Sequence, residues 1–152
     1  MLREKLTADL KTAMLGKNEI AVHTIRLINA AIKQKDIDGR TAESREGISE
    51  PQILSLLQTM IKQRQESIKM YEQGKRQDLV DKEAGEIKII ENYLPKQLSE
   101  AEMKDVVAKT ITAVGAANIK DMGKVMNELK AKYSGQMDFA KVGGIVKEKL
   151  AG

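Results

Sequence analysis

Apolar residues recur every three or four positions along most of the chain, which is the spacing that lines one face of an α-helix. Near the N-terminus, Leu2, Leu6, Leu10 and Ala13 follow this spacing and predict a helix that ends near Gly16. We find no alternating run of apolar and polar residues long enough for a strand. The predicted helices cover about residues 2–15, 19–34, 50–73, 78–94, 100–114, 122–133 and 139–150.

Residues that start and stop helices support these boundaries. The segments 49–52 (SEPQ) and 99–102 (SEAE) have the spacing of capping boxes, in which a serine and an acidic or amide side chain pair with the first free backbone N–H groups. Gly74 is placed as a C-cap, and Pro95 ends the fourth helix because the residue before proline disfavours helical backbone. The polar segment 36–47 is predicted to be an exposed loop.

The pattern predicts an all-α, multihelical protein in two parts. A four-helix N-terminal subdomain covers residues 1–95, and a small three-helix C-terminal subdomain covers residues 96–152. The last helix contains Gly143 and Gly144, which we expect to allow close contact with a neighbouring helix, at a cost of about 1 kcal/mol per glycine in helix propensity.

Two charges interrupt the apolar stripes of the third and fourth helices. Arg64 lies in the middle of one stripe and Glu83 in the middle of the other. The short connection between these helices predicts an antiparallel hairpin. A charge in such a stripe has to be paired or reach water. We therefore expect a structural ion pair between Arg64 and Glu83 that fixes the register of the hairpin.

Composition narrows the classes of protein and of site. Aromatic residues make up 3% of the chain, so the core is built from aliphatic side chains and methionine. Cysteine is absent, which excludes disulfides and thiolate metal sites. No stretch approaches the roughly 20 apolar residues of a membrane span, and the first ten residues lack an apolar signal core. These features favour a cytoplasmic protein.

Catalytic chemistry finds little support in the sequence. The single histidine, His23, has no partners for a metal site and is expected to be structural or exposed. No glycine-rich phosphate loop is present, and no serine has a base at an informative spacing. We expect no metal, no cofactor and no catalytic residue.

Several segments together resemble one protein family. They are 26–33 (RLINAAIK), 61–67 (IKQRQES), 71–79 (YEQGKRQDL), 91–99 (ENYLPKQLS) and 121–126 (DMGKVM). This combination resembles the YqeY family of small bacterial proteins. The C-terminal part of that family is similar to the tail domain of the GatB component of the tRNA-dependent amidotransferases.

The resemblance implies an all-α fold in two subdomains and a link to tRNA. In the amidotransferase, the tail helps to hold the tRNA while other domains carry out amide transfer, and those domains are missing here. A binding role is therefore implied without a catalytic residue. The leading hypothesis is a tRNA- or RNA-binding accessory module. The alternatives are a helical adaptor for an amidotransferase or a synthetase, and a carbon–nitrogen ligase with glutamine as amido-N-donor.

The charge distribution predicts where RNA would bind. The net charge is +4, and residues 96–152 hold 10 basic and 7 acidic side chains, against 16 and 15 in residues 1–95. On the face opposite the apolar stripe of the sixth predicted helix, Lys124 and Lys120, the latter just before the helix, lie near the centre. Lys130 flanks that face, and Lys141 begins the last helix. Four lysines are therefore the predicted contacts to RNA phosphates.

Overall fold

The computed structural model describes residues 1–40 and 47–151, and within these ranges it contains seven α-helices, one short 3₁₀-helix and no strand. The predicted all-α fold is confirmed. The chain divides into two compact units, Met1–Leu94 and Pro95–Gly152. None of the helices in the described ranges combines the length and hydrophobicity of a membrane span. The elements are α1 (Leu2–Leu15), α2 (Glu19–Asp38), α3 (Glu50–Gln73), α4 (Gln77–Glu91), α5 (Glu100–Val114), η1 (Ile119–Asp121), α6 (Met122–Tyr133) and α7 (Phe139–Ala151).

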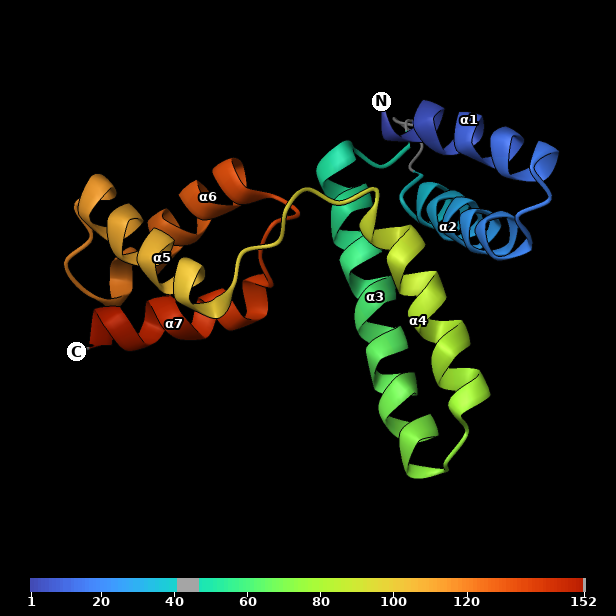
Figure 1. The fold of residues 1–152 in the computed structure, drawn as a ribbon. Helices are drawn as coiled ribbons and strands as arrows, with labels where there is room; N and C mark the ends of the chain where they lie inside the picture. The colour runs from blue at the N-terminus through green and yellow to red at the C-terminus, as the bar shows by residue number, and fades with distance from the viewer. Residues whose placement is uncertain (41–46, 152) are drawn as a thin grey trace. The chain divides into compact units, whose positions relative to one another are not determined.

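In the first unit, α3 and α4 form a long antiparallel hairpin. α1 and α2 form a second helix pair, which lies across the end of the hairpin that is away from its turn (Figure 1). The buried core follows this arrangement, because it gathers the middle of α2, the first half of α3 and the end of α4. Its members are Leu6, Ile25, Ile28, Ile32, Ile53, Leu57, Met60, Ile90 and Tyr93.

Two helix ends in this unit differ from the prediction. α2 continues to Asp38 instead of ending near residue 34, because no helix breaker precedes Gly39 and Asp36 is held by contacts outside the helix. Of the predicted loop at 36–47, residues 36–38 are therefore helical and residues 41–46 lie outside the described part. α4 ends at Glu91, since Tyr93 and Leu94 turn more tightly, with N–H groups that donate to carbonyls three residues back.

The anchor of Asp36 is an ion pair with Arg3 of α1. The guanidinium donates to both carboxylate oxygens at 2.8 Å, and the backbone N–H of Ile48 donates to Oδ1 at 2.8 Å. A Cβ on Gly47 would lie 2.6 Å from Arg3 Nη2 and 2.7 Å from Asp36 Oδ1, so a larger residue there would displace the paired side chains. The contacts join the start of α1, the end of α2 and the residues before α3.

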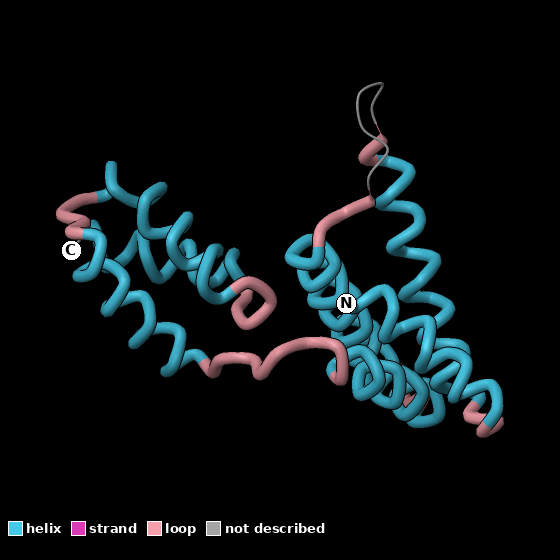
Figure 2. Tube along the Cα trace, turned by 90° about the horizontal axis from the view of Figure 1, so that it is seen from above, coloured by secondary structure: helices cyan, strands magenta, loops and turns pink. Residues whose placement is uncertain are grey.

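The second unit is a three-helix bundle in which α5, α6 and α7 each pack on the other two. Figure 2 shows the short loops that separate its helices. Its core is distinct from that of the first unit and contains Met103, Val107, Val125, Leu129, Met137, Val142, Val146 and Leu150. The capping box at Ser99 and Glu102 is present, as is the one at Ser49 and Gln52 that begins α3.

The glycines of α7 do not serve the close helix contact that we expected. A Cβ on Gly144 would meet no atom within 4 Å, and one on Gly143 would lie 3.8 Å from Met122 Cε, an ordinary contact distance. The space around Gly115 is also open, but its φ of 69° is a left-handed conformation that ends α5.

We predict that alanine substitutions at two of these glycines have opposite effects on stability. Gly144→Ala should stabilise the fold by up to about 1 kcal/mol, because glycine is a poor helix former and nothing blocks the added methyl group. Gly115→Ala should destabilise it by about 1 kcal/mol, because a Cβ is strained at positive φ. Urea denaturation of the full chain measures both, and effects of the same sign would contradict the assignment of the α5 cap.

The Arg3–Asp36 pair predicts a loss of stability in acid. Hydrogen bonds from Arg3, and then from the N–H of Ile48, lower the pKa of Asp36 from 3.8 to about 2. The carboxylate therefore stabilises the fold above pH 3.8, and this contribution is lost as the pH falls through about 2. We expect Asp36→Asn to cost roughly 1–2 kcal/mol near neutral pH, after allowance for the partial exposure of the pair. The difference between wild type and variant, followed by urea denaturation, should narrow towards pH 2, and a constant difference would show that another group carries the effect.

Candidate nucleic-acid interface

The four lysines predicted to contact RNA are all exposed in the second unit. Lys120 lies in η1, Lys124 and Lys130 lie on α6, and Lys141 lies in the first turn of α7. Lys120 and Lys124 lie near the start of α6, and Lys130 and Lys141 lie on either side of the turn that joins α6 to α7. The two lysines of α6 are six residues apart, or about 9 Å along the helix axis. The four lysines are thus spread over three consecutive elements of the second unit.

Three other lysines of the same unit are paired with neighbouring carboxylates. Lys132 lies 2.9 Å from Glu128, and Lys104 and Lys109 of α5 pair with acidic residues one turn earlier, at 3.7 Å and 3.0 Å. Among the described residues, no ion pair is recorded for the four predicted contacts. The four predicted contacts therefore make no close ion pair, although the charge of Lys124 acts on Asp121 at the start of α6.

The carboxylate beside Lys120 is engaged by the backbone. Asp121 accepts hydrogen bonds from the N–H groups of Ala117 and Asn118, and these bonds, in that order, lower its pKa. Asn118 caps η1 through a hydrogen bond from the N–H of Lys120. These contacts fix the turn before α6 and leave the ammonium group of Lys120 in solvent.

The predicted ion pair of the first unit has a different partner. Arg64 does not pair with Glu83; its Nε donates to Oε2 of Glu86 at 3.0 Å, and its Nη1 donates to the carbonyl of Met60 at 3.1 Å. Glu83 lies nearby, and its pKa is raised by burial and then by the charge of Glu86, against the opposing effect of Arg64. Glu83 and Glu86 are about one turn apart on α4, and the axial offset between α3 and α4 places Glu86 beside Arg64.

A third helix, α2, contacts the Arg64–Glu86 pair through His23, which the sequence predicted to be structural or exposed. His23 Nε2 of α2 lies 3.4 Å from Oε1 of Glu86, whose side chain is 5% exposed. One carboxylate oxygen of Glu86 therefore contacts a side chain of α3, and the other contacts a side chain of α2. The imidazole itself is 53% exposed and reaches solvent.

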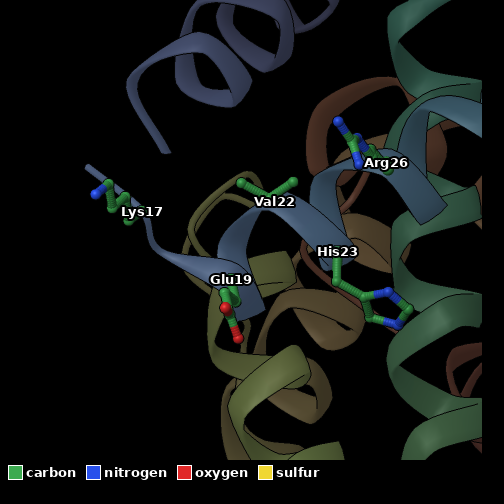
Figure 3. A pocket seen from close by; sticks show the side chains of 5 residues that line it. All are labelled: Lys17, Glu19, Val22, His23 and Arg26. Carbon is green, nitrogen blue, oxygen red and sulfur yellow. The ribbon is translucent and has the colours of Figure 1, made fainter. Parts of the chain in front are cut away.

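An open pocket of about 250 Å³ lies beside His23, on the first turns of α2. Its lining residues are Lys17, Glu19, Val22, His23 and Arg26. In Figure 3 these side chains diverge, and Lys17 and His23 point away from each other. The pocket offers no convergent set of groups for a ligand. Across residues 1–40 and 47–151, no cluster of three or more His, Cys, Asp or Glu side chains is suited to hold a metal ion.

The buried pair predicts unequal effects of two neighbouring glutamates. Glu86→Ala should cost roughly 3 kcal/mol, because it leaves the Arg64 guanidinium without its carboxylate in a mostly buried site. Glu83→Ala is the matched control and should change the free energy of unfolding by less than about 0.5 kcal/mol, since it removes a carboxylate that Glu86 repels. Urea denaturation of both variants tests this, and equal costs would show that the two carboxylates share Arg64.

Comparison with known proteins identifies the family. The model of the family described as Yqey-like protein matches residues 3–150, which is nearly the whole chain. The chain is 39% identical over 106 residues to Altered inheritance of mitochondria protein 41, mitochondrial, of Kluyveromyces lactis, a match that covers 70% of the chain and 55% of that protein. It is 36% identical over 115 residues to the protein of the same name from Lachancea thermotolerans, covering 74% of the chain and 59% of that protein.

A third relative of the same name, from Pyrenophora tritici-repentis, is 30% identical over 135 residues, covering 84% of the chain and 71% of that protein. The chain thus spans little more than half the length of the first two relatives. All three are named as mitochondrial proteins, which contradicts the cytoplasmic location that we expected. The family resemblance is confirmed: the chain belongs to the YqeY-like family.

Proposed function

We propose that this protein is an accessory module that binds tRNA or another structured RNA through its C-terminal unit. The observation that supports this most directly is the excess of exposed lysines in this unit: Lys104, Lys109 and Lys132 are ion-paired, and no ion pair is recorded for the four predicted contacts or for Lys96, Lys147 and Lys149. Binding of lysines to phosphates releases condensed counterions and requires no particular base sequence. The resemblance of this part of the chain to the amidotransferase tail agrees with such a role.

The contact is to the backbone and shape of the RNA and not to its bases. Proteins that bind single-stranded bases stack them on exposed aromatic rings. In the second unit, Tyr133 and Phe139 are partly buried and pack against the core of the bundle. Lysine ammonium groups, in contrast, act as mobile point charges that suit the irregular phosphate path of a folded RNA.

A helical adaptor for an amidotransferase or a synthetase is the second candidate. The observation that favours it is Ile119, an apolar side chain that is 45% exposed beside Lys120 and has no use in phosphate binding. We assign no catalytic residue to the chain in either role.

The test is binding of fluorescently labelled bulk tRNA, measured by anisotropy at several salt concentrations. With three or four phosphate contacts, log affinity should fall against log salt with a slope of about −2 to −4. Replacement of both Lys124 and Lys130 by glutamate should weaken binding at least about tenfold, or 1.4 kcal/mol, and flatten the slope. Both side chains are exposed, so the fold should be retained.

The matched control reverses Lys104 and Lys109, the ion-paired lysines of α5. It changes the net charge by the same amount in the same unit and should weaken binding much less. Equal affinities and slopes for all three proteins would remove RNA from this surface. Copurification of a protein partner that survives nuclease treatment would then favour the adaptor.

A further inference from the structure

α2 has a second face that is turned away from the core of the first unit. Its buried residues Ile25, Ile28 and Ile32 lie along one side of the helix. Along another side, exposed residues recur at alternating steps of three and four, which is the spacing of the residues that meet along the seam of two packed helices. We call these residues the outer face of α2, and they are Ile20, His23, Leu27, Ala30, Gln34 and Ile37.

The outer face contains three large apolar side chains that are open to solvent. Ile20, Leu27 and Ile37 have exposed fractions of 39%, 36% and 44%. The side chain of Ile20 is partly used within the unit, because it fills the space that a Cβ on Gly85 of α4 would occupy. Leu27 and Ile37 belong neither to the core nor to the apolar residues packed on it. Single exposed apolar residues are ordinary, whereas several on one helix face indicate a surface that a partner covers.

Cations flank the middle of the outer face. Arg26 and Lys33 are both exposed, and they lie on the same side of the helix because seven residues, or about 10 Å along the axis, separate them. Residues 20–35 include no Asp or Glu, and the carboxylates of Glu19 and Asp38 lie at the two ends of the helix. Among the described residues, no ion pair is recorded for either of the two cations. The outer face therefore presents positive charge beside apolar side chains.

We propose that the outer face of α2 binds an acidic amphipathic helix of a protein partner. The apolar residues of such a helix pack against Leu27 and Ile37, and carboxylates beside its apolar stripe meet Arg26 and Lys33. Phosphates of an RNA would pair with the two cations and leave the two apolar side chains without a contact. A helix that carries both kinds of group matches the surface more completely. This surface belongs to the first unit and does not depend on the lysines proposed to bind RNA.

The open pocket at the start of α2 extends this surface. Its lining includes Val22 and Arg26, which project from the same side of the helix (Figure 3). Its volume of about 250 Å³ is smaller than that of most small-molecule sites, which begin at about 300 Å³. Because the charged side chains around it diverge, the pocket suits one apolar side chain inserted by the partner helix.

The test uses two synthetic peptides of the same length as α2. Both have leucine at alternating steps of three and four, and the positions that flank the leucines are glutamate in one peptide and lysine in the other. Binding of each fluorescently labelled peptide to the full chain is measured by anisotropy, at concentrations at which the peptides are monomeric. We expect the acidic peptide to bind at least about tenfold more tightly than its basic twin. Equal affinities, or no binding of the acidic peptide, would overturn the proposal.

Two double variants of the chain locate the peptide. Arg26→Glu with Lys33→Glu should weaken binding of the acidic peptide at least about tenfold, because attraction becomes repulsion. Leu27→Gln with Ile37→Gln should also weaken it about tenfold, because the apolar contact is lost while glutamine remains a good helix former. All four side chains are exposed, so the fold should be retained, and far-ultraviolet circular dichroism checks this. Full binding by the second variant would show that charge alone attracts the peptide and would overturn the proposal.

The matched control reverses Lys69 and Lys75, which are exposed near the turn of the α3–α4 hairpin. It changes the net charge of the same unit by the same amount and should leave peptide binding unchanged. The double reversal in the second unit that tests RNA binding should also retain the peptide, so the two proposals can fail separately. If reversal of Arg26 and Lys33 weakens binding of bulk tRNA and not of the acidic peptide, the outer face would be a nucleic-acid surface, and the proposal would be overturned.

Discussion

The carboxylate of Glu86 has to be paired wherever the fold places it, because an unpaired charge in a buried site costs several kcal/mol. Arg64 of α3 meets this requirement, and the imidazole of His23 on α2 lies 3.4 Å from the other carboxylate oxygen. The guanidinium of Arg64 also donates to the carbonyl of Met60 on its own helix. Contacts on both α3 and α4 therefore hold the guanidinium in place. A displacement of α4 by one turn would exchange Glu86 for Glu83 or for an apolar residue. The ion pair thus restricts the register of the hairpin, whereas apolar packing alone would tolerate several registers.

The two units are stabilised by different kinds of interaction. In the first, polar contacts hold helices together at several points: Arg3 with Asp36, the Tyr93 hydroxyl with Asp9 at 2.5 Å, and the cluster around Glu86. In the second, the core is aliphatic and methionine-rich, and Thr110 is its buried polar residue among those described. Because the bundle places its charges on the surface, its lysines can serve an external partner without affecting its own packing.

Local sequence patterns predicted the positions of the helices well and the pairing of charged side chains less well. Periodicity and capping residues located all seven helices, since both signals act within one or two turns. The prediction that Arg64 pairs with Glu83 was wrong because Glu83 and Glu86 both lie near the apolar face of α4. The axial offset between α3 and α4, which brings Glu86 to Arg64, arises from tertiary packing. His23 gave no signal, as its partner is 63 positions away in the chain. The exposure of Lys124 and Lys130 followed directly from the apolar stripe of α6, whereas binding to RNA depends on a partner that no pattern within one helix describes.

The order of packing along the chain has a consequence for how the first unit assembles. α1 packs on α2, and α3 packs on α4, so most of its contacts join neighbours in sequence. Topologies of this kind close small loops first and fold quickly. The turns at residues 16–18 and 74–76 have the same length, so both helix pairs close short loops. The bond from Tyr93 to Asp9 spans 84 positions and encloses almost the whole unit. By the same loop-closure argument, we expect this bond to form after the two helix pairs.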